Sequence, residues 1–464
     1  MLAIFPVIYI SAFLVALKFL IEKKRQGFLI FLIFGLCIYN TVLSITFSLG
    51  FTSLIGLFKS LKELIVLLLL GIQIYWNKKT FRFQTVDYVV GFYLIYTVIY
   101  ALLPIGVQPL SDRIASLKNI AFFPLLYLCG RLFDFRSFQL HKYYNYILYV
   151  TIAASVLVLY EFVTYQHFQT MTGYADYQYY FYDAEATGRY GLTFTFETDE
   201  GLKRFASFFA SPLELAGSTL LSLAIIASIS TTDENKIKLT NFGIVTLAAT
   251  QICIFLAISR SSFISYFLMI YVYALVTKKR VITNLIYSLA VCGVLYFLFL
   301  LRNKEIQDFI ISTINFSNPS SVGHIIGWIE GINSIISHPF GIGMGTSGIL
   351  AGNTGENTGG ENEFIIIGVQ AGIIAGLAYL ATYFIIIKTA WQKFPSLKGK
   401  ERKLCLMVLL IKIGLLIPLF TSELEISSYI SYLTWFFSGL FISVIASKSS
   451  SEKRVEKIKF TQTV

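Results

Sequence analysis

The chain has 464 residues, of which 56% are hydrophobic and 14% are charged, and its formal net charge is +11. No division of this composition into water-soluble domains leaves each domain enough polar surface, so an ordinary soluble enzyme is excluded. The composition predicts an all-α, polytopic membrane protein, because a helix satisfies its own backbone hydrogen bonds within lipid.

Apolar runs long enough to cross about 30 Å of hydrocarbon recur along almost the whole chain. The first run has no basic segment before it and no small-residue cleavage site after it, so we expect it to be retained as a helix and not removed as a signal peptide. About 13 membrane helices are predicted, with 12 to 14 as the range. They lie near residues 2–21, 27–49, 54–76, 86–107, 119–133, 143–163, 207–230, 239–258, 261–277, 281–301, 364–387, 404–422 and 428–447.

Basic residues predict how these helices are oriented. Alternate connections, together with the C-terminal tail, hold 25 of the 37 lysines and arginines. Basic connections stay on the cytoplasmic side of a membrane, so the N-terminus and two long polar loops are expected outside. The positive charge is therefore a topology signal, and no nucleic-acid partner is predicted.

This reading divides the chain into six segments. The last is expected to lack fixed structure and to lie near anionic lipid. The segments are N-terminal membrane helices 1–163, a first outer loop 164–206, central membrane helices 207–301, a second outer loop 302–363, C-terminal membrane helices 364–447 and a basic cytoplasmic tail 448–464.

The first outer loop combines six carboxylates with seven tyrosines and also holds Arg189. Sugar rings stack on aromatic faces and hydrogen-bond to carboxylates, so the loop is a candidate sugar-binding surface. The alternative is an aromatic belt at the lipid–water interface.

Two arginines mark the outer mouth of the predicted bundle. Arg204 lies where the first loop re-enters the membrane, and Arg260 lies in the connection between two apolar runs. A guanidinium near lipid is costly unless it is paired or faces water, and its planar fork matches a phosphate. We therefore predict a diphosphate site, with snorkelling or a structural ion pair, for example to Glu214, as the alternative.

The second outer loop carries three further features. His324, Trp328 and Glu330 lie on a predicted amphipathic helix that begins near His324, because isoleucines at 325, 329, 332, 335 and 336 follow a helical period. Glycines at 341, 343 and 345 permit a tight turn. The run Glu361-Asn362-Glu363 precedes the next apolar segment, where it supplies either reactive carboxylates or a helix cap.

Four features together resemble the bacterial O-antigen polymerase and ligase superfamily. They are Ser259-Arg260, the helix through Trp328, the turn His338-Pro-Phe-Gly-Ile-Gly-Met-Gly345, and Glu361-Asn362 leading into Gly368-Val-Gln-Ala-Gly372. The resemblance covers about residues 200–390. It implies a metal-independent glycosyltransferase without cofactors, which acts on polyprenyl-diphosphate-linked oligosaccharides at the outer face of the bacterial inner membrane. It also implies a flippase and a chain-length regulator as partners. Relatives often carry arginine near position 324, and ligases typically carry histidine where this chain has Glu361, so polymerase is favoured over ligase.

The residues fit this chemistry. A sugar hydroxyl that attacks an anomeric carbon needs a base, and the departing diphosphate needs cations. Glu361, Glu363 or His324 is the candidate base, Arg204 and Arg260 are the candidate cations, and no metal site is predicted because the loop has no Asp-x-Asp. The predicted catalytic residues are Glu361, His324 and Arg260, and the predicted substrate-binding residues are Arg204, Arg189, Trp328, Asn362, Glu363 and Glu330. A ligase, and a flippase with ionisable groups along its path, remain alternatives.

Overall fold

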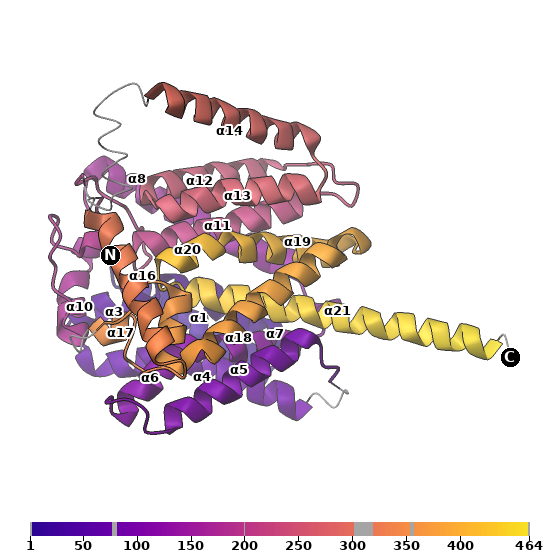
Figure 1. The fold of residues 1–464 in the computed structure, drawn as a ribbon, viewed down its shortest axis with the longest axis horizontal. Coiled ribbons are helices and arrows are strands. Elements are labelled where there is room, and N and C mark those ends of the chain that lie inside the picture. The colour runs from indigo at the N-terminus through magenta and orange to yellow at the C-terminus, as the bar shows by residue number, and fades with distance from the viewer. Residues whose placement is uncertain (1, 77–80, 199, 301–318, 353–356, 463–464) are drawn as a thin grey trace.

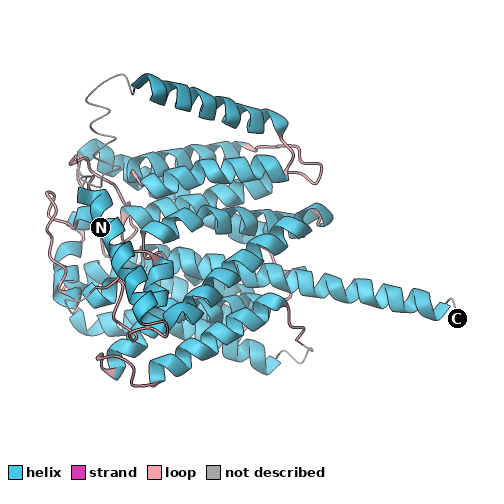
Figure 2. Cartoon of the chain, viewed as in Figure 1, coloured by secondary structure: helices cyan, strands magenta, loops and turns pink. Residues whose placement is uncertain are grey.

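The computed structural model describes residues 2–76, 81–198, 200–300, 319–352 and 357–462. The described residues form helices joined by short turns, with two isolated antiparallel bridges (Figures 1 and 2). The α-helices are α1 Ile4–Ile21, α2 Phe28–Ile30, α3 Tyr39–Ser48, α4 Thr52–Trp76, α5 Thr85–Leu102, α6 Leu110–Ala121, α7 Phe123–Arg131, α8 Leu140–Thr164, α9 Phe168–Met171, α10 Tyr174–Tyr182, α11 Pro212–Ser230, α12 Asn241–Ala257, α13 Arg260–Val276, α14 Arg280–Leu300, α16 Pro319–Ser337, α17 Ile349–Gly352, α18 Glu363–Lys393, α19 Gly399–Gly414, α20 Leu416–Thr421 and α21 Ser428–Gln462.

The predicted fold class is confirmed: the protein is an all-α, polytopic membrane protein. Eight helical segments of the described residues are long and apolar enough to cross a membrane, and four shorter apolar helices accompany them. The apolar runs that the sequence predicts as spans coincide with helices of the described residues, although three of these helices, α4, α6 and α7, are not among the twelve apolar segments.

Three boundaries differ from the prediction. The short fifth run is two helices, because Pro124 lies in the first turn of α7, a position that needs no amide hydrogen. The helix α18 is 31 residues long and contains a break at Gly372, whose φ of 83° is not helical. The helix α21 continues through the basic tail to Gln462 and projects from the bundle in Figure 1, so the expectation of an unstructured tail is wrong.

The C-terminal helix lies in the centre of the core. Gly130 of α7 and Gly439 of α21 face the partner backbone so closely that an added Cβ would collide with it. Beside this contact the rings of Phe123 and Trp435 stack 4.2 Å apart. Small residues of this kind let membrane helices approach closely, since lipid supplies no hydrophobic driving force between them.

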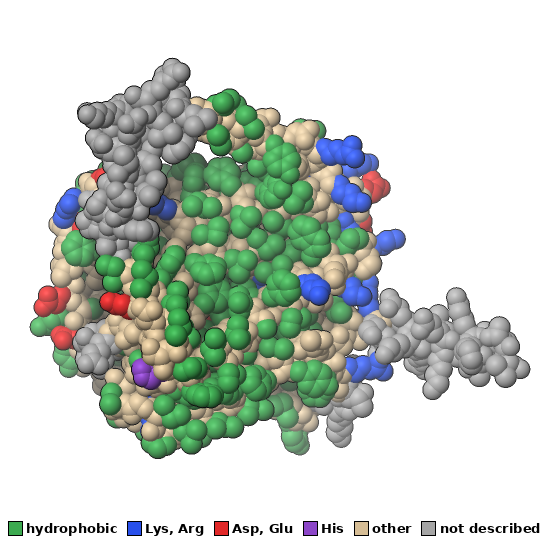
Figure 3. Space-filling model, in the orientation of Figure 1, with side chains coloured by type: hydrophobic (Ala, Val, Ile, Leu, Met, Phe, Trp, Pro, Cys, Tyr) green, Lys and Arg blue, Asp and Glu red, His purple; other side chains and the backbone are tan. Residues whose placement is uncertain are grey.

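The molecule has two polar faces, one of which is strongly basic. Most of the lysines and arginines drawn in Figure 3 gather at one edge, and Asp and Glu side chains appear at the opposite edge. We call the first the basic face, defined by Lys23–Arg25, Arg131, Arg136 and Lys278–Arg280. It is the side that the sequence assigns to the cytoplasm. The opposite face carries α10, α16 and α17 (Figure 1).

Candidate functional site

The glycine turn of the second outer loop fits into the break of α18. Gly341, Gly343 and Gly345 all have positive φ, as the sequence predicted for a tight turn. A Cβ on Gly341 would lie 2.6 Å from the Gly372 nitrogen, so the two backbones touch. The Ile342 amide donates to the carbonyl oxygen of Val369 over 2.9 Å. The break in α18 thus provides the backbone groups that hold the turn.

Gln370 holds this turn in place from inside α18. Its side-chain oxygen accepts a hydrogen bond from the Gly345 amide over 3.0 Å, and its side-chain nitrogen donates to the Ser347 carbonyl over 2.8 Å. Ser116 of α6 donates to the same side-chain oxygen. One buried amide therefore joins two helices to the second loop, which is fixed against the bundle at this point.

Next to the turn, four glutamates form what we call the acidic group: Glu361, Glu363, Glu423 and Glu425. Glu363 is 1% exposed, and one of its oxygens accepts the Glu425 amide over 3.2 Å. Glu425 is also buried and accepts hydrogen bonds from Tyr379 at 2.5 Å and from Trp435 at 2.8 Å. Glu361 alone of the four is exposed. The acidic group thus contains two buried, hydrogen-bonded carboxyl groups, Glu363 and Glu425, and one exposed carboxyl group, Glu361.

Glu423 lies between these extremes. It is half-buried and accepts the Ile349 amide over 2.7 Å. Burial, and to a lesser degree the nearby charge of Glu361, raise the pKa of the Glu423 carboxyl from 4.5 to about 7, although the amide hydrogen bond opposes this. Glu361 and Glu423 thus differ in exposure. In catalytic sites, such a difference lets one carboxyl group act as an acid and the other as a base.

The structure assigns Asn362 the capping role that the sequence left as an alternative. Its side-chain oxygen accepts the amides of Phe364 and Ile365 at 3.0 and 3.3 Å, and the residue is 3% exposed. Glu363, in the first turn of α18, is equally enclosed. Both residues therefore have a structural role here, their substrate-binding role stays a prediction, and Glu361 is the exposed member of the run.

The helix α16 brings Trp328 and Glu330 to the same loop. It packs through glycines, because a Cβ on Gly327 would lie 3.1 Å from Gly360 and one on Gly331 would lie 2.8 Å from Gly359. Trp328 is half-buried, and its indole nitrogen is enclosed without a hydrogen-bond partner among the described atoms. Glu330 is exposed.

One expectation for α16 needs correction. The helix begins at Pro319 and not near His324, because proline is favoured in the first helical turn. The isoleucines at 329, 332 and 336 are exposed, so the glycine side packs on the protein and this apolar stripe faces outward. The side chain of His324 lies outside what the structure describes, and its catalytic role stays a prediction.

Lysines of α4 and α6 lie near the start of α21 and beside the first loop. Lys62 donates to the Ser428 hydroxyl over 2.9 Å. Lys118 forms an ion pair of 2.9 Å with Glu63, the residue next to Lys62. Lys59, one helical turn earlier, lies 4.4 Å from the ring of Phe181 in α10. These contacts link α4 to the first residue of α21, to α6 and to the aromatic first loop.

The three predicted arginines gather around a different segment, residues 200–204. The Arg204 side chain donates to the carbonyl of Ala257 over 3.2 Å, at the end of α12. Arg260 begins α13, and its charge helps to lower the pKa of Glu200, after hydrogen bonds from that residue's own amide and from Thr198. The Arg189 guanidinium covers Gly201 so closely that a Cβ there would collide with it.

The described contacts therefore form two clusters, an arginine cluster (Arg189, Arg204, Arg260) and the acidic group. That Arg204, Arg260 and Glu361 serve one donor site stays a prediction. Among the described residues, no three His, Cys, Asp or Glu side chains are grouped to hold a metal ion.

Sequence reasoning missed Glu423 and Lys62. Lys62 was classed as a charge within a span, and Glu423 lies in a six-residue connection, 422–427, that has no motif. A signal was present, because charges at the end of an apolar run are costly unless they are paired or near water. Neither the scan of family models nor the search of curated proteins found a match to this chain.

Proposed function

We propose that the protein is a glycosyltransferase that polymerises polyprenyl-diphosphate-linked oligosaccharide repeat units into O-antigen or a related capsular or exopolysaccharide. The reaction takes place at the face opposite the basic face, on the outer side of a bacterial inner membrane. One observation carries the proposal. An exposed carboxylate, Glu361, acts electrostatically on the half-buried carboxyl of Glu423 in a loop fixed to a membrane-embedded bundle, and burial raises the pKa of that carboxyl to about 7.

The proposed chemistry is acid–base catalysis of sugar transfer. The acceptor hydroxyl loses its proton to Glu361 as its oxygen bonds to the anomeric carbon of the donor sugar, and the bond from that carbon to the diphosphate breaks. The leaving diphosphate retains the electron pair and is stabilised by cations. In this proposal Glu423, whose pKa is raised by burial, exchanges a proton with Glu361 between turnovers.

Two sets of cations compete for the diphosphate. The arginine cluster offers planar forks that bind a phosphate through two hydrogen bonds, whereas the lysines of α4 offer point charges. Arg260 is exposed, whereas Lys62 is hydrogen-bonded to Ser428. We assign the diphosphate to Arg260 and Arg204.

The test is elongation of a lipid-linked oligosaccharide by the purified protein in detergent, read as a ladder of chain lengths. Glu361→Gln should lower elongation by two or more orders of magnitude, the range that a general base contributes. Arg260→Ala should abolish elongation, and Arg260→Lys should restore little of it. The matched control is Glu234→Gln, an exposed glutamate paired with Lys236. EDTA should leave the rate unchanged.

Each part of the proposal can fail separately. Full elongation by both Glu361→Gln and Glu423→Gln would contradict the assignment of the catalytic base. Normal polymer from Arg260→Ala at normal expression would remove the diphosphate assignment. A single transfer to an acceptor lipid, without a ladder, would identify a ligase instead.

The flippase alternative is supported by Lys412. This lysine is fully buried in α19, its nitrogen lies 3.3 Å from the Trp435 ring, and it has no hydrogen-bond partner among the described atoms. A buried cation next to the Trp435–Glu425 hydrogen bond is what a transport path would require. Detergent removes the two compartments on which transport depends, so elongation there decides for the polymerase.

A further inference from the structure

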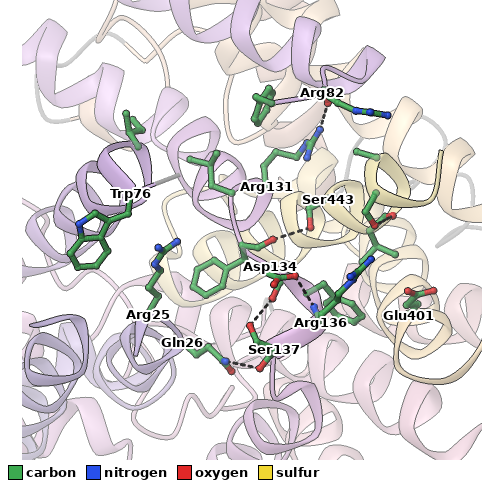
Figure 4. Close-up of a pocket in the computed structure, with 18 of the residues that line it drawn as sticks. Arg25, Gln26, Trp76, Arg82, Arg131, Asp134, Arg136, Ser137, Glu401 and Ser443 are labelled. Atoms are coloured by element: carbon green, nitrogen blue, oxygen red, sulfur yellow. Dashed lines mark hydrogen bonds between the residues drawn. The ribbon is translucent and has the colours of Figure 1, made fainter. Parts of the chain in front are cut away.

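A second polar site lies on the basic face, far in sequence from the loops discussed above. It is an open cavity of about 1490 Å³ between the ends of several helices (Figure 4). None of the nine residues predicted from the sequence lines it. Seven lining residues are basic and two are acidic. Such an excess of one charge in a concave surface attracts anions strongly.

The two acidic side chains of the cavity are already engaged. Glu401 forms an ion pair of 2.6 Å with Lys448. Asp134 accepts the Arg136 amide over 3.1 Å and so caps the short turn that follows it. Among the described residues neither lining carboxylate forms an ion pair with Arg25, Arg82 or Arg136, whose guanidinium groups lie on different sides of the space in Figure 4.

The walls of the cavity are built by hydrogen bonds between distant segments. The Gln26 side chain donates to the Ser137 carbonyl over 2.8 Å and accepts the Gln139 amide over 2.8 Å. The Arg131 side chain is 5% exposed, forms an ion pair of 3.0 Å with the buried Asp87, and donates to the Arg82 carbonyl. These links fix the positions of the cations, so little ordering is needed when a ligand binds.

An aromatic residue orients two of the cations. The Trp76 ring lies 5.5 Å from the Arg25 guanidinium and 5.3 Å from the Lys23 nitrogen. Ile74, Phe133 and Ala446 add an apolar lining next to this charged rim. A cationic rim above an apolar wall suits a ligand with an anionic head and a hydrocarbon part.

We propose that this cavity is a binding site for a phosphate-bearing ligand, with the phosphate held by Arg25 and Arg136 and any hydrocarbon chain placed along Ile74 and Phe133. The geometry favours an anionic phospholipid headgroup over a free phosphate, because the cavity opens at the membrane's basic face and has apolar walls. The site is separate from the sugar-transfer site and does not depend on it.

The test compares ligands and variants on the full-length, delipidated protein. Binding is measured with nanodiscs or mixed micelles of phosphatidylglycerol, with phosphatidylcholine as the uncharged-head comparison, and with inorganic phosphate as the soluble probe. Arg25→Gln/Arg136→Gln should weaken phosphatidylglycerol binding about tenfold or more, because each basic residue near the headgroups contributes about 1 kcal/mol. Arg280→Gln, an exposed arginine of the same face outside the cavity, is the matched control and should change it less than twofold.

Two further variants test the proposal if Arg25→Gln/Arg136→Gln folds poorly. Ser137→Glu adds a carboxylate at an exposed rim position and should also weaken binding, whereas Arg25→Lys/Arg136→Lys should retain most of it. If the wild-type protein binds inorganic phosphate and the cavity variants do not, the site is supported and its ligand is a soluble phosphate. Equal loss in Arg280→Gln, or no loss of either probe in the cavity variants, would overturn the proposal.

Discussion

Glu361 and Glu423 show how position alone gives two identical side chains different chemistry. Glu361 is exposed in the turn before α18, whereas Glu423 is half-buried under the Ile349 amide. In the proposed reaction the first takes a proton from the acceptor hydroxyl, and burial raises the pKa of the second to about 7.

The raised pKa of Glu423 predicts a dependence of stability on pH. The folded protein holds this proton up to about pH 7, whereas the unfolded chain releases it near 4.5. The stabilisation is therefore complete below about pH 4.5 and is lost as the pH rises to about 7, by about 1–3 kcal/mol. We expect thermal unfolding in detergent to show a higher midpoint at pH 5 than at pH 8. Glu423→Gln should reduce this difference, and Glu234→Gln should not; an unchanged difference in Glu423→Gln would contradict the assignment.

At the scale of one element, the break in α18 makes the loop site possible. Gly372 has a φ of 83°, and a Cβ there would lie 2.6 Å from the Pro339 carbonyl oxygen. Gly372→Ala should therefore destabilise the protein by about 2 kcal/mol or more, through backbone strain and this collision. Gly376→Ala is the control, because its Cβ would meet no atom within 3.5 Å and alanine favours a helix. Melting curves of the two variants measure the difference; equal midpoints would contradict the strain.

The sequence could predict the helices but not how they meet. Each apolar run was recognised because lipid requires long apolar segments with internal hydrogen bonds. The glycine turn was also predicted, since its three glycines permit positive φ. The role of its partner, Gly372, was not predicted. A single glycine is common in an apolar run, and only the contact with Gly341 in the structure shows what Gly372 does.

The same limit applies to the site. Glu361 was identified from its local run, but its neighbour Glu423 is 62 residues away and is brought close only by the packing of α18 and α20. The sequence predicted an amphipathic helix for α16 but not which of its sides packs on the protein. In a membrane protein an apolar stripe also faces lipid, and small residues mark the packed side.

For the whole molecule, the separation of charge between two faces predicts the topology. Thr187 in the first loop and Phe340 in the second are exposed, and Lys278 is exposed on the basic face. Single cysteines at Thr187 and Phe340 should react with an impermeant thiol reagent in intact cells, and one at Lys278 only after the membrane is opened. Cys292 is the exposed native cysteine of the described residues and must first become serine. Labelling in the opposite order would reverse the orientation.

The close contact of Gly130 and Gly439 also constrains how the protein is made. The helix α7 is synthesised about three hundred residues before α21, yet α21 fills the space against it. Until the ribosome has finished the last span, the earlier helices must wait in the membrane with a vacant seam beside Phe123 and Asp87. A membrane chaperone that covers such a gap during insertion, or a lipid that fills it for a time, would therefore affect the yield of this protein strongly. The effect would be smaller for a bundle in which helices that pack together are also synthesised one after the other.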